Sequence, residues 1–198
     1  MKKLKVSFIF FIASGFALST MSACSTDDNP VLPVLNDGNS KTEVATIVVP
    51  PGEKVFYDFK TAALVDSAQS MINLSGMYGS ALNNSQSGTY TMGYFDKEES
   101  SIDELKLADV LNASLTPTDA FSIDASSAGA PATGPTWIIY DFKNNHAVYP
   151  TPDRYIVIYK GEGLSENTDE LYILNADSVA AAQGTATYSI NVKKFIKE

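Results

Sequence analysis

The chain has 198 residues, 44% of them apolar and 11% aromatic, so it is neither collagen-like nor wholly disordered, and a single domain is the default expectation. Its 14 Lys and Arg residues and 23 Asp and Glu residues give a formal net charge of −9. This acidic balance argues against nucleic acid or an anionic membrane surface as the partner, because both bind proteins through clustered Lys and Arg. One cysteine, Cys24, and one histidine, His146, exclude an intramolecular disulfide and a zinc site of the finger or ribbon type.

The first 23 residues have the order of a secretory signal. A basic segment, 1–5, precedes an apolar segment, 6–18, and small residues then lead to Met21-Ser22-Ala23-Cys24. Small residues directly before a cysteine resemble a bacterial lipobox, although Met21 stands where Leu is usual. The resemblance implies cleavage before Cys24 and lipid attachment to its sulfur, hence a signal peptide over 1–23. The alternative is an ordinary secretory signal followed by an unrelated cysteine.

A polar segment follows Cys24. Residues 25–40 are rich in Asp, Asn, Pro and Gly, a composition that cannot bury enough apolar surface to offset chain entropy. We therefore expect a disordered acidic tether over 24–40 and one folded domain over 41–198. The pair Asp27-Asp28 resembles the acidic export signal of outer-membrane lipoproteins that face the cell surface; alternatively, the two acids belong to a solvated linker.

The remaining sequence predicts a mostly β, antiparallel domain. Alternating or β-branched segments separated by Gly, Asn, Asp or Pro are typical of strands, and they occur at 44–49, 55–59, 71–74, 89–95, 137–142, 154–160, 170–174 and 185–195. Two segments are predicted as helices. Ser101 to Leu111 begins with the Ser-x-x-Glu spacing of a capping box, and Asp177 to Gln183 combines an N-cap residue with three alanines before Gly184. Ala125 to Thr136 lacks large apolar residues and predicts an exposed loop.

No catalytic motif is evident. The chain has no Gly-x-Ser-x-Gly elbow, no His-Glu-x-x-His, no glycine-rich phosphate loop and no Rossmann fingerprint. A hydrolase using the paired acids Glu98-Glu99 or Asp103-Glu104 is a third class of function, but these acids lie in a polar stretch that is typical of a solvated face. The sequence therefore indicates a binding protein rather than an enzyme.

Binding-type residues gather in the second half of the chain. Segments 137–142 and 154–159 are predicted to form a long hairpin whose polar tip carries His146. Its aromatic side chains suit either the core or a platform for a flat ligand. A histidine at such a tip is either a surface residue or a ligand of a metal.

The aromatic strands resemble the HmuY-like haem-binding lipoproteins. The resemblance rests on Trp137 and the strand after it, on Arg154-Tyr155-Ile156-Val157-Ile158, on Val55 to Lys60 and on Tyr188 to Phe195, together with Cys24 and the acidic tether. It implies an all-β fold that captures haem at the cell surface and grips the iron with two axial side chains, His or Met, from projecting hairpins. An outer-membrane receptor is a possible partner of such a protein.

The sequence departs from this family pattern in its ligands. Phe142 stands where the family can place one ligand. The family's other ligand lies on a hairpin before the Trp, but here Ala125 to Thr136 is too short for it and contains no His, Met, Tyr or Cys. The expected haem-contacting residues are therefore His146, which would bind the iron, with Met77, Phe142 and Tyr149. Met71 and Met92 are expected in the core, and other oxygen donors are Tyr78, Tyr90 and Tyr94. The alternative function is a non-enzymatic surface protein that binds a glycan, a peptide or a partner protein.

Overall fold

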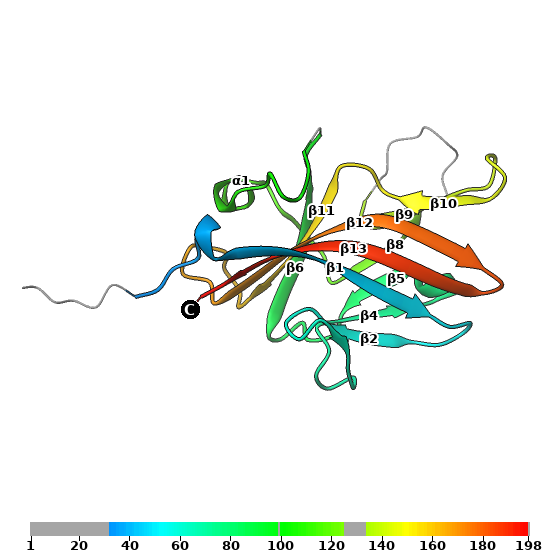
Figure 1. The fold of residues 1–198 in the computed structure, drawn as a ribbon, viewed down its shortest axis with the longest axis horizontal. Coiled ribbons are helices and arrows are strands. Elements are labelled where there is room, and N and C mark those ends of the chain that lie inside the picture. The colour runs from blue at the N-terminus through cyan, green and yellow to red at the C-terminus, as the bar shows by residue number, and fades with distance from the viewer. Residues whose placement is uncertain (1–31, 99, 125–133, 198) are drawn as a thin grey trace, which may run out of the picture. The chain divides into compact units, whose positions relative to one another are not determined.

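The computed structural model describes residues 32–98, 100–124 and 134–197, which form two β-sheets and so confirm the mostly β, mostly antiparallel fold (Figure 1). The first sheet has six strands in the order β1-β13-β12-β11-β6-β7. Its strands are β1 (Ser40–Val49), β6 (Tyr90–Asp96), β7 (Thr116–Pro117), β11 (Arg154–Lys160), β12 (Glu170–Ala182) and β13 (Thr185–Ile196). All of its strand pairs are antiparallel.

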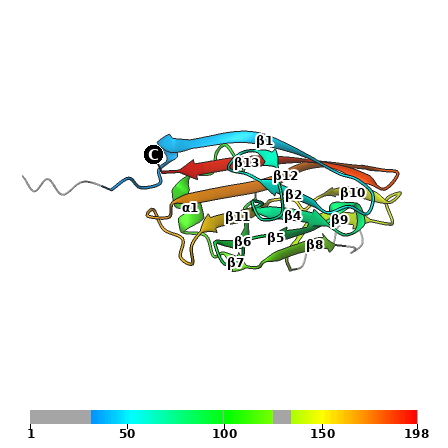
Figure 2. The ribbon, with the colours of Figure 1, turned by 90° about the horizontal axis from the view of Figure 1, so that it is seen from below.

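The second sheet has seven strands in the order β10-β9-β8-β5-β4-β2-β3. Its strands are β2 (Val55–Asp58), β3 (Ala63–Leu64), β4 (Ile72–Ser75), β5 (Ala81–Asn84), β8 (Ala120–Asp124), β9 (Thr136–Asp141) and β10 (Ala147–Pro150). Only the pairing of β8 with β9 is parallel among these described strands. Figure 2 shows the two sheets lying one over the other.

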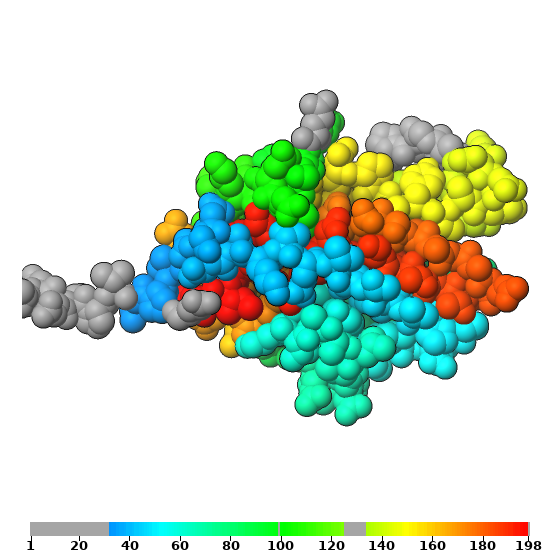
Figure 3. Space-filling view, in the orientation of Figure 1, coloured from blue at the N-terminus to red at the C-terminus, as the bar shows by residue number. Residues whose placement is uncertain are grey.

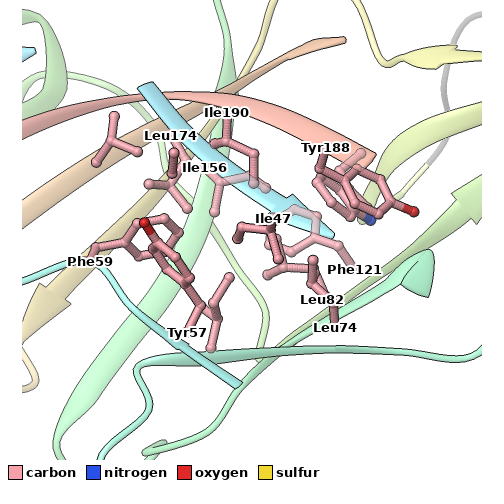
Figure 4. Packing of buried hydrophobic residues seen from close by; sticks show 14 of the residues in the cluster. Ile47, Tyr57, Phe59, Leu74, Leu82, Phe121, Ile156, Leu174, Tyr188 and Ile190 are labelled. Carbon is pink, nitrogen blue, oxygen red and sulfur yellow. The ribbon is translucent and has the colours of Figure 1, made fainter. Parts of the chain in front are cut away.

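The main core lies between the sheets. Side chains alternate in burial along β1 and its neighbour β13. Ile47 and Val49 of β1 and Tyr188 and Ile190 of β13 point inward, while their neighbours along each strand face solvent or are half-buried. They meet Tyr57, Leu74, Leu82 and Phe121 from the second sheet (Figure 4), and Ile72 belongs to the same core. Burial of this apolar surface is the main force that holds the two layers together.

A second core covers the other face of the six-stranded sheet. Val157, Leu171 and Phe195 pack there against Leu107 and Val110 of the only described α-helix, α1 (Leu107–Leu111). The same core contains residues that the sequence assigned to the tether: Leu35 is 2% exposed and its backbone N–H donates to the carbonyl of Glu166 at 2.8 Å. A 3₁₀ turn, η1 (Asp37–Asn39), then leads into β1 at Ser40. The prediction of a tether up to residue 40 is therefore wrong for residues 35–40, which belong to the folded domain.

The helix predicted over Ser101 to Leu111 is only partly correct. The backbone N–H and the hydroxyl of Ser101 both donate to the Glu104 carboxylate, at 3.1 and 3.0 Å, but the segment forms a turn. The helix begins at Leu107, where the Asp109 carboxylate accepts a 2.8 Å hydrogen bond from the backbone of Lys106. An acidic side chain thus accepts a hydrogen bond from the backbone three residues before it at two places, Glu104 from Ser101 and Asp109 from Lys106. Only the second of these pairs begins a helix.

The helix predicted over Asp177 to Gln183 is wrong. These residues form the outer half of β12 and the turn after it, and β12 pairs with β13 as far as Ala182 and Thr185. Gln183 and Gly184 have φ values of 51° and 86°, as a two-residue hairpin turn requires. Pairing along β13 outweighs the helix preference of three alanines.

The long hairpin predicted from segments 137–142 and 154–159 is also wrong. β9 pairs with β10, and Arg154 to Lys160 form β11 in the opposite sheet between β6 and β12. The Arg154 guanidinium donates to both oxygens of Asp96 at 2.8 Å and to the carbonyl of Thr136 at 2.7 Å. This contact fastens the start of β9 to the six-stranded sheet.

Several predictions fall on residues outside the described ranges. These are the signal peptide over 1–23, the lipid-bearing Cys24, the tether up to residue 31, and most of the loop predicted over Ala125 to Thr136. Thr136 is described, and it is the first residue of β9 rather than part of a loop. Within the described residues, no helix has the length and apolar character needed to cross a membrane.

Candidate functional site

A cavity of about 870 Å³ opens where three hairpins meet at one end of the two sheets. Figure 3 shows two of them, β9–β10 in yellow and the end of β12–β13 in orange and red, beside each other. The third is the connection between β4 and β5, which contains the 3₁₀ turn η2 (Met77–Gly79). The cavity is lined by Met77, Tyr78, Ser80, Ile123, Ile138, Tyr140, His146, Ala147, Val148, Val179, Ala181 and Tyr188.

The described residues of the lining are mostly apolar, with a few polar groups, and none of them is Asp, Glu, Lys or Arg. Aliphatic walls come from Ile123, Ile138, Val148 and Val179, whereas the polar atoms are hydroxyls, one imidazole and one thioether. Concave sites of this size and composition are typical of small-molecule and cofactor pockets. A ligand held here would bury an apolar body and would have to keep any ionised group outside the walls.

The η2 wall is held in an unusual backbone conformation. Gly76, Tyr78 and Gly79 have φ values of 78°, 56° and 69°, in the left-handed region that favours glycine. A Cβ atom at Gly79 would lie 2.7 Å from Val49 Cγ2, so only glycine fits between the turn and β1. Met77, at the start of the same turn, is 75% exposed.

Two buried aromatic side chains hold this turn from beneath. The Tyr188 hydroxyl donates a 2.6 Å hydrogen bond to the carbonyl of Tyr78, and the Trp137 indole N–H donates at 2.7 Å to the carbonyl of Ser80. Burial raises the pKa of the Tyr188 phenol above its usual value, so Tyr188 remains a neutral donor. These two hydrogen bonds from buried side chains therefore hold η2 in position.

The opposite wall is the hairpin β9–β10. Its loop is closed by Asp141, whose buried carboxylate accepts hydrogen bonds from the backbone N–H groups of Lys143 and Asn144, both at 3.1 Å. The backbone N–H of Ala147 donates to the carbonyl of Asn144 at 3.0 Å across Asn145 and His146, which have φ values of 52° and 59°. These two residues thus occupy the centre of a tight turn of the primed type.

Tyr140 and His146 form a pair on this wall. The Tyr140 hydroxyl lies 2.5 Å from His146 Nδ1, and the two rings stack with centroids 5.8 Å apart. Tyr140 is half-buried on β9, whereas His146 is exposed on the turn. The Nε2 atom of His146 and the lone pairs of the Tyr140 oxygen are the donors that the pair can offer to a ligand.

Backbone strain gathers at this cavity. Six described residues other than glycine have a positive φ, and two of them, Tyr78 and His146, line the cavity from opposite walls. A side chain in the left-handed region costs about 1–2 kcal/mol, which is retained only where the surroundings enforce it. Strain at functional side chains is a common feature of ligand sites.

The structure brings together two of the four predicted ligand residues. His146 and Met77 both line the cavity, although they are 69 positions apart in the sequence. Phe142 and Tyr149 do not line it: Phe142 is 48% exposed beside Lys143, and Tyr149 pairs with Ile139 and lies half-buried. Phe142 and Tyr149 therefore lie outside the residues that line the cavity.

The other candidate donors are also placed. Met71 and Met92 are each 1% exposed in the core, as expected. Tyr90 donates to Glu170 at 2.9 Å, and Tyr94 packs beneath the Arg154 guanidinium at 4.2 Å, so both serve the fold. Of the additional tyrosines, only Tyr78 reaches the cavity.

Tyr140, Val179 and Ala181 line the cavity but are not among the ligand residues predicted from the sequence. Tyr140 was predicted on a strand but not paired with His146; its position six residues before the only histidine, across a turn, is the signal that would have found it. Val179 and Ala181 were missed because their segment was predicted as a helix. Only as strand residues do they reach the cavity, two positions apart on one face.

The described residues contain no group of three or more His, Cys, Asp and Glu side chains that could hold a metal ion. A metal at this cavity would therefore have to arrive with its own ligands, as iron does in a porphyrin. No family model, curated protein or solved structure matches this chain.

Proposed function

We propose that this protein binds haem or a related porphyrin without catalysing a reaction, and that the cavity between η2 and the β9–β10 hairpin is the binding site. The observation that carries the proposal is the arrangement of donors. Tyr140 and His146 lie on one wall and the exposed thioether of Met77 on another, around aliphatic side chains. Imidazole, phenolate and thioether groups all bind haem iron, and the faces of the macrocycle bury well against aliphatic side chains.

The charge of the lining supports the same ligand. Because none of the described lining residues is Asp, Glu, Lys or Arg, the cavity suits the apolar body of a porphyrin, whose two propionates would remain at the mouth in water. The volume of about 870 Å³ falls within the range of cofactor pockets. The loop of the β9–β10 hairpin contains one lysine, Lys143, which is exposed and lies two residues after the end of β9.

The cellular setting is part of the proposal. The signal-like residues 1–23 and Cys24 support a lipid anchor, and an acidic segment behind the anchor supports display on the outer membrane. In that setting the domain would take up haem outside the cell and pass it to an outer-membrane receptor. The folded domain begins near Leu35, which leaves only a short segment between the anchor and the domain.

A pair of cavity variants tests the site. Ala181→Trp would fill the cavity from β12, whereas Ala180→Trp adds the same side chain at the adjacent exposed residue, which does not line it. We expect the parent and Ala180→Trp to shift and sharpen the Soret band of haemin on titration, and Ala181→Trp to bind at least about 10-fold more weakly, or 1.4 kcal/mol. Equal affinities for all three proteins would place haem elsewhere. An unchanged haemin spectrum with the parent would favour a glycan, a peptide or a protein as the partner.

A further inference from the structure

We propose that the outer edge of β1 binds the same strand of a second copy of this chain, so that two chains share one continuous antiparallel sheet. Within the described part of the chain, β1 pairs with β13 on one side and with no strand on the other. Figure 2 shows β1 along the outer margin of the six-stranded sheet. No residue of β1 lines the cavity, so this surface is separate from the site proposed for haem.

The other three edges of the two described sheets are short or covered. β3 and β7 contain two residues each, and β7 ends with Pro117. β10 has four half-buried residues and lies beside β12. By contrast, β1 has ten residues, and residues 44–49 contain no charge, proline or glycine. Short strands, charges and prolines are the usual means by which proteins prevent edge pairing, so β1 is the edge that favours a strand partner.

The solvent face of β1 presents apolar side chains along this edge. Val44 and Val48 are 61% and 46% exposed, and Thr46 lies exposed between them. The side chains of Ala45 and Ile47 point the other way, into the core. β-Branched residues on a strand are stabilised by packing against directly opposite side chains of a neighbouring strand, and on its outer side β1 lacks such a neighbour among the described residues.

The sequence of β1 is complementary to itself. A two-fold axis between two antiparallel strands has to pass through a residue position, because successive opposed pairs alternate between hydrogen-bonded and non-hydrogen-bonded types. With the axis at Thr46, Val44 of each copy lies opposite Val48 of the other, and the two Thr46 residues lie opposite each other. Pairs of β-branched residues and Thr–Thr pairs are both favourable across antiparallel strands.

Charge favours a second copy at this edge over other faces of the molecule. The chain has a formal net charge of −9, so two copies repel each other over most of their surface. The paired residues 44–48 are uncharged. In the register centred on Thr46, Lys41 lies opposite Pro51 of the other copy. Glu43 lies opposite Val49, so this pairing brings no two like charges directly opposite each other.

Cysteine cross-linking of the full-length protein tests this register. In Thr46→Cys the two introduced thiols lie on directly opposed residues with Cα atoms about 4.5–5.5 Å apart, within the range of a disulfide. We expect mild oxidation to convert this variant to a linked dimer. Val44→Cys and Val48→Cys should each fail to cross-link alone, because each residue lies more than about 12 Å from its own copy, whereas a mixture of the two should cross-link. The parent, oxidised in parallel, reports any contribution of Cys24.

Sedimentation velocity tests the dimer itself. We expect the parent to sediment with twice the mass of the chain. Thr46→Lys should raise the dimer dissociation constant at least about 10-fold, because two ammonium groups then meet at the axis. Ala180→Lys is the matched control: it adds the same charge to an exposed residue of β12, two strands from the edge, and should remain dimeric.

Hydrogen exchange of the parent needs no variant. The amides of β1 should exchange more slowly as the protein concentration rises, since the dimer protects them. A monomeric parent whose β1 exchange is independent of concentration would overturn the proposal, whether another part of the chain or a strand of a different protein covers this edge. Cross-linking of Val44→Cys alone, or dissociation of the dimer by both lysine variants, would overturn the pairing at Thr46.

Discussion

Trp137 of one sheet stacks on Tyr188 of the other, with ring centroids 4.9 Å apart and an interplanar angle of 24°. Because each ring also donates a hydrogen bond to the η2 segment, the stack joins three parts of the chain directly beneath the cavity. The floor of the site is therefore built from the same contacts that join the two layers. A change in the packing of Trp137 or Tyr188 should therefore also change the position of η2, which forms one wall of the cavity.

Tyr188→Phe tests this coupling. The substitution keeps the stacked ring but leaves the carbonyl of Tyr78 without its donor, so we expect a loss of about 1–2 kcal/mol in the free energy of unfolding. Haemin affinity should fall as well, because η2 loses one of its two supports. Tyr159→Phe is the matched control: its hydroxyl makes a 3.4 Å contact with the carbonyl of Glu162, and neither residue lines the cavity. Urea unfolding that gives the same stability for both variants would contradict the coupling.

Substitutions at His146 separate backbone strain from ligand chemistry. His146 has a φ of 59°, which glycine adopts without penalty and alanine does not. We expect His146→Gly to be more stable than His146→Ala by about 1 kcal/mol, with both variants lacking the contact to Tyr140. Thermal unfolding of the two proteins side by side is the measurement. Equal stability of the alanine and glycine variants would show that the left-handed conformation at position 146 does not destabilise the folded protein.

The acid stability of the domain should depend on Glu170. Burial raises the pKa of its carboxyl, but hydrogen bonds from Lys60, Tyr90 and Tyr172 outweigh burial, and the pKa lies below its usual value. A pKa lower in the folded state means that the stabilisation is fully present above the ordinary glutamate pKa and is lost as pH falls through the folded pKa. We therefore expect the free energy of unfolding to decrease in the acid range below the ordinary glutamate pKa.

Glu170→Gln provides the comparison. It should cost about 2 kcal/mol at neutral pH, because hydrogen bonds to a charged group are lost, and it should flatten the acid part of the stability profile. Glu162→Gln changes an exposed residue in the connection between β11 and β12. It should leave the stability at neutral pH and the acid part of the profile unchanged. A profile of Glu170→Gln that is as steep as the parent's would show that other carboxylates account for the acid dependence.

The strands were predictable because their signals are local. β11 spans the predicted residues 154–160, and β13 follows the alternation predicted over 185–195. Strand partners were not predictable in the same way, since the β11 segment pairs with β6 and β12 in the opposite sheet. Likewise, the alanines of 177–183 favour a helix in isolation, and only pairing with β13 makes them a strand.

The candidate site was partly predictable for a similar reason. A histidine at a polar tip and a methionine between glycines are expected to be exposed, and both are, at His146 and Met77. That these two residues share one cavity depends on the packing of hairpins far apart in the sequence, which no local pattern reveals. The same dependence explains why Tyr140 and the β12 residues were missed.

The most direct test of haem binding uses the fluorescence of Trp137, the only tryptophan in the chain, which lies beneath the cavity. Haemin is added to the purified protein, and emission is compared with that of free N-acetyltryptophanamide under the same conditions, which reports inner filtering alone. Haem in the cavity predicts saturable quenching that ends at one haemin per chain. Quenching that follows the free tryptophan derivative, with no saturation, would contradict the proposal that this cavity binds haem.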